Sequence, residues 1–320
     1  MKKAVMLSSW ASKKLPWPVL LLWTACFSGF SASATPTTFK VASYNVENYL
    51  LQPTASRTPK AADARAQVRQ GILKLQPDVL ALQEMGDTNA LMELRAALKA
   101  DGLDYPFYEH ISGADPDIHV AVLSRFPFSA RQPQTNDDFL LNGRRFHVSR
   151  GFAQVTLEVN TNYFFTLLVT HLKSKRSVVE ADETELRLEE AKILRQKVDA
   201  LLQSDPDANI LVAGDFNDTK NSASTRAVLG RGKAKLIDVR PAEQNGDSPM
   251  PLRSGWEPRN ITWTHYYRTE DSYARIDFLL ASPGMARELR PEGTYVLAMP
   301  NWGAASDHRP IVATFMATDQ

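Results

Sequence analysis

The chain has 320 residues, with 37 Lys and Arg against 36 Asp and Glu, and its formal charge is +1. Its 43% hydrophobic and 23% charged residues are typical of a globular protein and exclude a disordered, collagen-like or coiled-coil chain. A single cysteine, Cys26, excludes a disulfide framework and a Cys-rich zinc or iron–sulfur site. The near-neutral charge argues against a protein that binds nucleic acid through a strongly basic surface.

The N-terminus has the pattern of an export signal. It contains, in order, a basic stretch, an apolar run and a small-x-small cleavage pattern, formed by Lys2, Lys3, Lys13 and Lys14, residues 19–27, and Ala32-Ser33-Ala34. The alternatives are a membrane anchor and a lipoprotein acylated at Cys26. The apolar run is nine residues long, whereas a bilayer span needs about 20. Trp23 stands where a lipoprotein signal would carry a small aliphatic residue. A cleaved signal peptide over residues 1–34 is therefore the favoured prediction.

Cleavage after Ala34 would leave residues 35–320 as a single domain that is secreted or periplasmic and has no cysteine. It removes four basic residues and no acidic one, so the charge of the mature chain becomes −3. A polyanionic substrate would then have to be bound by a local group of cations. No membrane span is expected after signal removal, and nothing in the sequence implies a stable protein partner.

Helical and strand patterns alternate along the rest of the chain. The predicted elements are, in chain order, a strand at 41–44, a helix at 60–75, a strand at 79–82, a helix around 91–98, strands at 120–123, 153–159 and 163–170, a helix around 191–201, and strands at 210–213, 276–281 and 311–315. Two irregular stretches, residues 128–151 and 241–260, are predicted to be long loops. The alternation predicts one mixed α/β domain.

Acidic, amide and imidazole residues recur at the ends of the predicted strands. They are Asn45, Glu47, Glu84, His171, Asp215, Asn217, Asp277, Asp307 and His308. Each alone could be a solvated charge, a turn residue or a core histidine. Strand ends can converge at one edge of a sheet, where side chains are rigidly held and open to solvent. Their recurrence at the same place relative to strands therefore predicts one functional site.

The residue types at this predicted site fit phosphoryl transfer. Carboxylate and amide oxygens without a thiolate are the ligands that Mg²⁺, Mn²⁺ or Ca²⁺ prefer, and histidines beside carboxylates supply acid–base groups. Lys173, Lys175 and Arg176 follow His171 and could bind an anionic substrate. The sequence has no GxSxG or SxxK motif for acyl transfer and no P-loop or GxGxxG motif for nucleotide binding.

A series of short motifs extends over residues 40–316. In order, they are Ser43-Tyr44-Asn45-Val46-Glu47-Asn48, Leu82-Gln83-Glu84, Val120-Ala121-Val122-Leu123-Ser124-Arg125, Thr170-His171-Leu172-Lys173-Ser174-Lys175, Gly214-Asp215-Phe216-Asn217, Arg275-Ile276-Asp277-Phe278 and Ser306-Asp307-His308-Arg309-Pro310. In this order they resemble the endonuclease/exonuclease/phosphatase superfamily. That group includes pancreatic-type deoxyribonucleases, abasic-site endonucleases, inositol-polyphosphate 5-phosphatases and bacterial sphingomyelinases.

The resemblance implies an α/β fold, a four-layer α/β/β/α sandwich of two mixed β-sheets flanked by helices. It also implies a divalent cation, Mg²⁺ or alternatively Mn²⁺ or Ca²⁺. Glu84 would be the principal metal ligand, assisted by Asn45 and Asp307.

The resemblance further implies catalytic roles. Asp215 and Asn217 would position the attacking water and the scissile phosphate. His308, oriented by Asp277, would be the general base or a phosphate-stabilising imidazole, and family members differ on which group takes the proton. His171 would lie near the leaving group. In the deoxyribonuclease-like branch the equivalent histidine pairs with a glutamate, and no such partner is identified among residues 115–119, which occupy that region.

The expected function is a secreted, metal-dependent phosphodiesterase, an endonuclease or exonuclease that hydrolyses DNA or RNA with low sequence specificity. Lys173, Lys175 and Arg176 would contact the backbone. Aromatic residues that could stack on bases, or instead pack in the core, are Trp256, Trp263, Tyr266 and Tyr267. One alternative is a phosphodiesterase or phosphatase acting on a phospholipid headgroup or small phosphoester. A non-catalytic binding module is disfavoured because both Glu84 and His308 are present.

Overall fold

The structure is a computed structural model that describes Met1 and residues 37–244 and 262–318. Apart from Met1, the predicted signal peptide lies outside the described residues, as do Trp256 and most of the loop predicted at 241–260. The described residues from 37 onward belong to one compact unit. No helix in residues 37–244 and 262–318 is both long and apolar enough to cross a bilayer.

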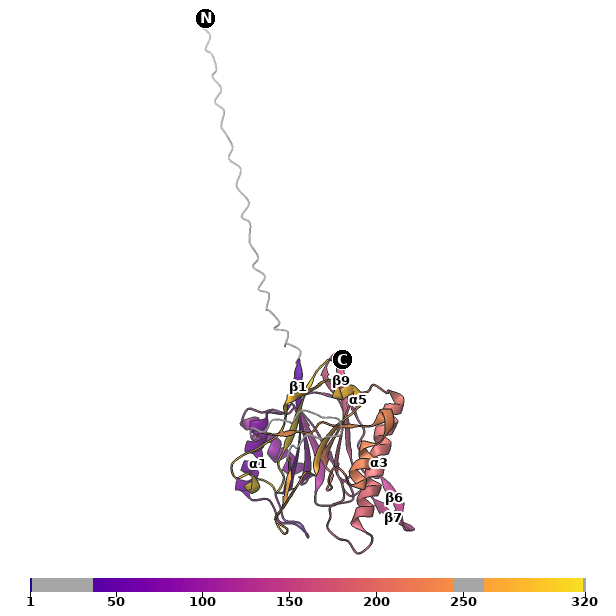
Figure 1. The fold of residues 1–320 in the computed structure, drawn as a ribbon. Helices are drawn as coiled ribbons and strands as arrows, with labels where there is room; N and C mark the ends of the chain where they lie inside the picture. Colours follow the sequence, from indigo (N-terminus) through magenta and orange to yellow (C-terminus); the bar gives the residue numbers. More distant parts are fainter. Residues whose placement is uncertain (2–36, 245–261, 319–320) are drawn as a thin grey trace. The chain divides into compact units, whose positions relative to one another are not determined.

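Two mixed β-sheets form the inner layers of this unit (Figure 1). The first sheet contains, in spatial order, β12 (Ala242–Glu243), β16 (Leu289–Val296), β17 (Ile311–Met316), β1 (Thr38–Tyr49), β2 (Val79–Met85), β4 (His119–Ser124) and β3 (Phe107–Ile111). The second contains β11 (Ile237–Asp238), β15 (Asp277–Ala281), β10 (Ile210–Asp215), β9 (Tyr163–His171), β8 (Ala153–Asn160) and β5 (Phe128–Arg131). Two separate hairpins pair β6 (Asp138–Leu141) with β7 (Arg144–His147), and β13 (His265–Tyr267) with β14 (Ser272–Ala274).

Helices cover the outer face of each sheet. α1 (Ala62–Leu75) and α2 (Thr88–Ala100) pack on the first sheet, and α3 (Glu183–Ser204) and α4 (Ala223–Leu229) pack on the second. Figure 1 shows α1 and α3 on opposite sides of the strands. The short elements are α5 (Pro283–Ala286), η1 (Gly232–Ala234) and η2 (Trp302–Ala304). The four-layer α/β/β/α sandwich implied by the family resemblance is therefore confirmed.

Side-chain alternation explains why the central strands are continuous apolar runs. In β2, Val79 and Ala81 point into the core between the two sheets, whereas Leu80 and Leu82 pack under the helices. β10 does the same, because Leu211 enters the core between the sheets and its neighbours face α3. A strand buried on both faces needs apolar residues at every position. The predicted strands and helices are all present. Most are longer than predicted, α3 by eight residues at its start, whereas α1 and β15 begin two residues and one residue later than predicted.

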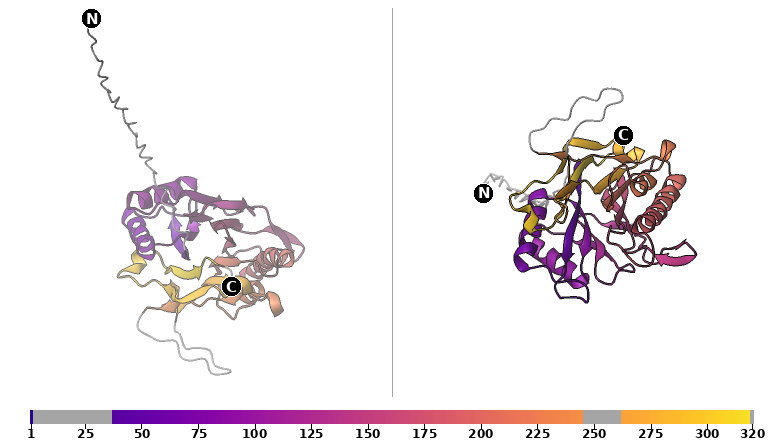
Figure 2. Two further views of the ribbon diagram at one scale, coloured as in Figure 1. Left: turned by 90° about the horizontal axis from the view of Figure 1, so that it is seen from above. Right: turned by 60° about the horizontal axis from the view of Figure 1, so that its bottom comes forward.

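The prediction of a long loop at residues 128–151 is wrong. This stretch contains β5, β6 and β7, and Figures 1 and 2 show the β6–β7 hairpin beside α3. Each of these strands has only four residues, most of them exposed, so no apolar run marks them. The missed signal is Asn142-Gly143, whose φ angles of 50° and 77° give the turn that favours two-residue hairpins.

Candidate functional site

The first half of the site comes from the ends of β1 and β2. The ladder between β1 and β2 becomes irregular after Asn45, and the ladder between β2 and β4 becomes irregular after Leu82. Glu47, Asn48 and Glu84 have φ angles of 44°, 53° and 58°, a region that non-glycine residues rarely adopt. Such irregularities re-aim side chains at the end of a sheet and cluster at functional sites.

Glu84 and Asn45 lie side by side at this end of the sheet. Glu84 Oε2 accepts a hydrogen bond from the backbone N–H of Asn48 (3.0 Å), and its Oε1 lies 3.4 Å from Asn45 Nδ2. Asn45 Nδ2 also donates to Asp215 Oδ2 at 3.0 Å, which joins the two sheets. Asn45 is buried, whereas the Glu84 side chain is 18% exposed. Glu84 is thus a fixed carboxylate that remains open to solvent.

The second half of the site is a row of side chains across the second sheet. The parallel register pairs His171 of β9 with Asp215 of β10, and the antiparallel register pairs Asp215 with Asp277 of β15. All three side chains are buried. His171 Nε2 lies 3.5 Å from Asp215 Oδ2 and 3.9 Å from Glu84 Oε1. The row therefore meets the Glu84 side of the site at His171 and Asp215.

Asn217 fixes the orientation of Asp215. The backbone N–H of Asn217 donates to Asp215 Oδ1 at 2.7 Å, and its side-chain amide donates to the carbonyl of Leu172 at 3.0 Å. Its φ of 52° turns the chain sharply after β10. One oxygen of Asp215 is thus held by its own turn, and the other faces Asn45.

His308 lies on the loop before β17 and forms a buried pair with Asp277. His308 Nδ1 is 2.9 Å from Asp277 Oδ2, and its Nε2 is 3.7 Å from Asp215 Oδ2. The loop is tied to β1, because the Ser306 hydroxyl accepts the N–H of His308 and donates to the carbonyl of Asn45. The Nδ1 contact with a carboxylate leaves Nε2 directed toward Asp215.

Charge and burial shift the pKa values of these groups. Burial raises the pKa of Asp215 to about 6, even though His308 opposes that shift. Burial alone would lower the pKa of His308, but Asp277 and Asp215 raise it well above its usual value. Burial and the Arg150 guanidinium lower the pKa of His171 well below its usual value. The site therefore combines a cationic imidazole, a neutral imidazole and a carboxyl group that titrates near neutrality.

Residues 115–119, where the family resemblance would place a carboxylate partner for His171, provide no such partner. Asp115 forms ion pairs with Arg150 at 3.4 Å and Arg57 at 3.8 Å, and Asp117 also lies 3.8 Å from Arg57. Within the described residues, His171 Nδ1 is buried and has no hydrogen-bond partner. The two arginines were not identified from the sequence, because long-range ion pairs leave no local pattern.

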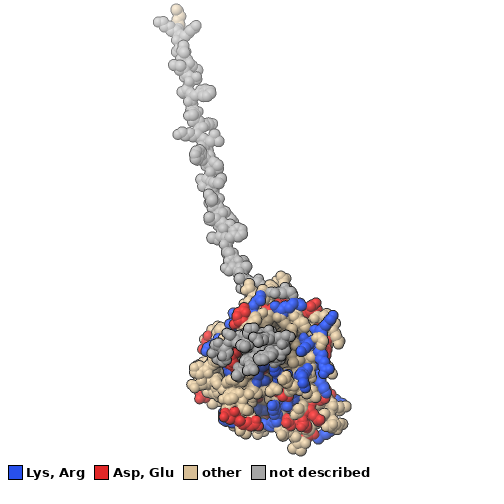
Figure 3. All heavy atoms as spheres, in the orientation of Figure 1, with Lys and Arg blue, Asp and Glu red and all other residues tan. Residues whose placement is uncertain are grey.

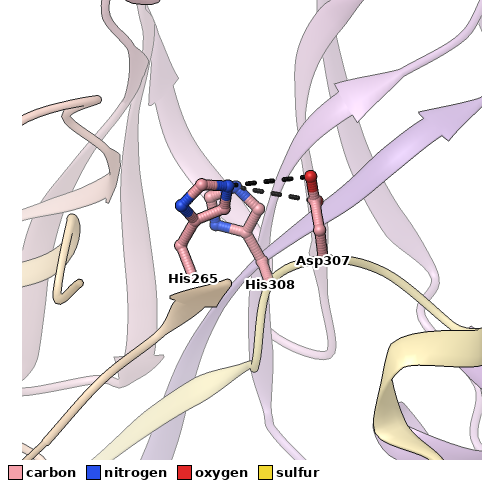
Figure 4. A group of neighbouring side chains, drawn as sticks. All are labelled: His265, Asp307 and His308. Atoms are coloured by element: carbon pink, nitrogen blue, oxygen red, sulfur yellow. Dashed lines mark ion pairs between the residues drawn. The ribbon is translucent and has the colours of Figure 1, made fainter. Parts of the chain in front are cut away.

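Asp307 lies beside His308 and faces a histidine that the sequence analysis did not identify. Its carboxylate oxygens lie 3.7 Å from His265 Nε2 and 3.9 Å from His308 Nε2 (Figure 4). Burial would raise the pKa of Asp307, but the nearby His265 and His308 imidazoles lower it. The Asp307 N–H donates to Glu47 Oε2 at 3.2 Å. His265 could not be found from sequence, because its short strand has no apolar run and its neighbour His308 is 43 positions away.

The three predicted substrate-binding cations have different surroundings. Lys173 is partly buried, and its Nζ donates to the carbonyls of Ser174 and Arg176, so it braces its own loop. The Lys173 N–H donates to the buried Glu190 of α3 at 2.6 Å. Lys175 and Arg176 are exposed. The structure therefore leaves these two side chains, which follow His171 in the chain, accessible to an anion.

Comparisons with known proteins agree with this arrangement. A sequence profile of the Endonuclease/Exonuclease/phosphatase family matches residues 42–308. Comparison with curated proteins gives no significant match. Among solved structures, sphingomyelinase C from Streptomyces griseocarneus is 21% identical, with a TM-score of 0.59 over 87% of this chain and 99% of the other. The human Nocturnin catalytic domain is 18% identical, with a TM-score of 0.58 over 88% and 95%.

Truncated TDP2 from Caenorhabditis elegans is also similar, at 15% identity and a TM-score of 0.55 over 88% of this chain and 98% of the other. At such identities the likeness concerns the fold, whereas the sequence profile covers most of the chain. Asn45, Glu84, Asp215, Asp277 and His308 converge within the matched range. The chain therefore belongs to the Endonuclease/Exonuclease/phosphatase family, whose members are metal-dependent phosphoric ester hydrolases.

Proposed function

We propose that this chain is an exported, divalent-metal-dependent phosphodiesterase that hydrolyses DNA or RNA with low sequence specificity. The main support for this proposal is that two groups of residues from different parts of the fold converge at Asp215. Asn45, which neighbours Glu84, donates to Asp215 at 3.0 Å, and the Asp277-paired His308 lies 3.7 Å from the same oxygen. Export rests on the predicted signal peptide at residues 1–34.

Glu84 fits a divalent cation such as Mg²⁺. Glu84 offers a carboxylate that is fixed by a backbone N–H yet partly exposed, so water could complete the coordination shell. Asn45 would position Glu84 rather than bind the cation, because its Oδ1 accepts the N–H of Glu47 and its Nδ2 faces Glu84. Asp307 borders the same site through Glu47. A bound cation would neutralise negative charge that develops on the phosphate.

The other residues of the site have complementary roles in this proposal. Asp215, with its pKa raised to about 6, would accept the proton of the attacking water, and Asn217 would keep that carboxylate in place. His308, held protonated by Asp277, would donate its Nε2–H to a phosphate oxygen. His171 is neutral and would face the leaving group.

An aromatic surface beside His308 supports a nucleic acid substrate. Trp263 contacts both Tyr273 (centroids 4.8 Å apart) and Trp302 (4.9 Å), while Tyr266 packs against Tyr273 with the two rings tilted by 34°. Tyr267 and Tyr273 are 46% and 56% exposed. Trp263 thus packs within the cluster, and the exposed tyrosines could stack on bases, which contributes about 1–3 kcal/mol per base. The turn between β13 and β14 carries Arg, Glu and Asp, a composition unsuited to membrane insertion.

A second candidate function, hydrolysis at a phospholipid headgroup, is favoured by one observation. Val178 and Val179 are exposed, and they follow Lys175 and Arg176 in the loop after His171. Apolar side chains next to cations are typical of surfaces that bind anionic membranes. The similarity to a sphingomyelinase C is consistent with this candidate.

One panel of assays tests both candidates. Residues 35–320 would be incubated with Mg²⁺, Mn²⁺ or Ca²⁺ and plasmid DNA, RNA, sphingomyelin vesicles, bis(p-nitrophenyl) phosphate or a phosphomonoester. We expect cleavage of nucleic acid and of the simple diester, loss of both with EDTA, and at least about 100-fold lower activity in Glu84→Gln. Activity that survives EDTA would contradict metal dependence. Activity on sphingomyelin without any on nucleic acid would favour the second candidate.

A further inference from the structure

Two imidazoles and one carboxylate meet at the outer edge of the site. One ligand atom from each of His265, Asp307 and His308 lies within 4.8 Å of the others. Figure 4 shows both rings directed toward Asp307, at 3.7 Å for His265 and 3.9 Å for His308. This set offers two nitrogens and one oxygen, unlike the oxygen donors around Glu84.

The backbone holds these three residues in fixed relative positions. His265 forms an antiparallel bridge with His308, and the ring centroids are 4.6 Å apart. The Tyr266 N–H donates to the carbonyl of Asp307 at 3.0 Å, and the Arg309 N–H donates to that of Thr264 at 2.6 Å. The set is therefore preorganised by main-chain hydrogen bonds on both sides of His265.

The donor set suits a late first-row metal. Two imidazoles with one carboxylate bind Zn²⁺ and related ions, whereas Mg²⁺ and Ca²⁺ prefer oxygen ligands alone. Ligand atoms about 2.0–2.1 Å from a tetrahedral Zn²⁺ lie roughly 3.4 Å apart. The ligand atoms of this set lie within 4.8 Å of one another, so metal binding would draw them together by up to about 1.4 Å. The side chains of Asp307 and His265 are 40% and 17% exposed, which leaves a solvent-facing position for a fourth ligand.

The hydrogen bond between Asp277 and His308 is a second feature that is typical of a metal site. Asp277 accepts the Nδ1 hydrogen of His308 at 2.9 Å in a buried setting. Histidines that bind zinc through one nitrogen commonly donate the other N–H to a carboxylate, which fixes the tautomer and strengthens the ligand. His308 is thus already arranged to present Nε2 to a metal at the His265 side.

We infer that His265, Asp307 and His308 form a second metal site, selective for Zn²⁺ and similar ions, whose occupancy inhibits the enzyme. A metal bound to His308 Nε2 would displace the Nε2 proton to solvent. That proton is the one that the proposed mechanism directs at the phosphate. The inhibitory part of the inference rests on the proposed function, and the metal site itself does not. His265 is the one member of the set with no part in the proposed reaction. Its substitution therefore tests the metal site without removing a residue of the proposed mechanism.

Binding of Co²⁺ tests the metal site without a measurement of enzyme activity. The full mature chain would be titrated with Co²⁺ in excess Mg²⁺, and the visible absorption of nitrogen-ligated, low-coordinate Co²⁺ would be recorded. We expect the band in the wild type, in Glu84→Gln and in His147→Gln, an exposed histidine of β7. We expect its loss in His265→Gln. A band that persists in His265→Gln with unchanged affinity would overturn the site.

A titration with Zn²⁺ tests whether occupancy of this site inhibits hydrolysis. Mg²⁺-dependent hydrolysis of bis(p-nitrophenyl) phosphate would be measured at rising Zn²⁺ for the wild type, His265→Gln and His147→Gln. We expect His265→Gln to need about tenfold more Zn²⁺ for half-inhibition and His147→Gln to match the wild type. Equal sensitivity of all three would refute inhibition through this site. A Co²⁺ band in a protein without hydrolase activity would refute the proposed function and leave the metal site intact.

Discussion

His308 shows how the charge of a buried residue depends on its partner. Burial alone would lower the pKa of His308, but the Asp277 carboxylate at 2.9 Å stabilises the charged imidazole. The pair also faces Asp215, whose carboxylate lies 3.7 Å from His308 Nε2. A change in Asp277 or Asp215 must therefore alter the protonation of His308.

The pairing predicts non-additive effects of substitution. Asp277→Asn and His308→Gln should each lower kcat by about 100-fold or more, because both remove the cationic donor. The double variant should lie within about threefold of His308→Gln, since residues that act as a unit cannot be lost twice. Steady-state kinetics on a simple diester measures this, with thermal unfolding as a control for folding. Effects that multiply would show that the two residues act separately.

The raised pKa values predict a bell-shaped pH profile. Activity should rise with pH through about 6, because Asp215 must lose its proton to act as a base. It should fall again above the raised pKa of His308, where the cation is lost. Asp277→Asn removes the carboxylate that raises this pKa, so the alkaline limb should move to lower pH. A kcat/KM that does not change between roughly pH 5 and 7 would contradict the assignment of Asp215, and an alkaline limb that stays in place in Asp277→Asn would contradict that of His308.

The candidate site was largely predictable from sequence because its members follow apolar strands. Glu84, His171 and Asp215 each stand directly after, or at the end of, a run buried on both faces. His265 and Arg150 were not predictable, because each reaches the site through a contact between segments distant in sequence. No residue pattern reports which loop will lie against which strand.

Gly214 shows how an element depends on a single residue. It precedes Asp215 in β10 and has a φ of 146°, and an added Cβ would lie 1.9 Å from the carbonyl oxygen of Thr170 in β9. The two backbones thus approach more closely there than any side chain allows. This approach keeps His171 and Asp215 in the same register of the parallel pair.

Gly214→Ala should therefore destabilise the protein by about 3 kcal/mol or more, through both the clash and the unfavourable φ. Urea unfolding measures this, and activity should fall because β9 and β10 separate where the site forms. Gly303→Ala is the matched control, since nothing lies within 4 Å of its added Cβ, and it should change stability by less than about 0.5 kcal/mol. Equal stability of the two variants would contradict the tight approach.

Elements buried on both faces were predictable, and exposed ones were not. β2 and β10 have apolar residues at successive positions because helices cover one face and the other sheet covers the second. β6 and β7 face solvent for most of their length, and only their Asn142-Gly143 turn marks them. β16 includes Pro291 and Gly293, and its pairing with β17 is irregular between Arg290 and Tyr295. Tertiary pairing, rather than local pattern, creates such strands.

At the scale of the whole molecule, charge is distributed rather than concentrated. The face in Figure 3 carries both Lys and Arg and Asp and Glu, with basic residues gathered along its right edge. Many cations are already paired, such as Arg145 with Asp138 at 2.6 Å and Lys197 with Asp137 at 2.8 Å. Binding of a polyanion would then depend on a few accessible cations near the site, of which Lys175 and Arg176 are the exposed candidates.

Few cations imply a shallow salt dependence of binding. Each phosphate neutralised on duplex DNA contributes roughly 0.9 to the slope of log affinity against log salt. Replacing Lys175 and Arg176 by Gln should weaken DNA binding and flatten that slope by up to about 1.8, if both contact the backbone. Hydrolysis of bis(p-nitrophenyl) phosphate should stay nearly unchanged, because neither side chain belongs to the proposed catalytic group. Binding isotherms at several salt concentrations give the slope directly.

The matched control is a pair of exposed lysines at the far end of the first sheet. Lys74 ends α1 just before β2 begins, and Lys99 ends α2, whereas Glu84 lies at the opposite end of β2. Seven residues of strand separate these ends by about 20 Å. Lys74→Gln/Lys99→Gln removes the same net charge and should leave the slope unaltered. An equal flattening in both double variants would mean that overall charge governs binding, and equal loss on the small diester would place Lys175 and Arg176 in the catalytic group.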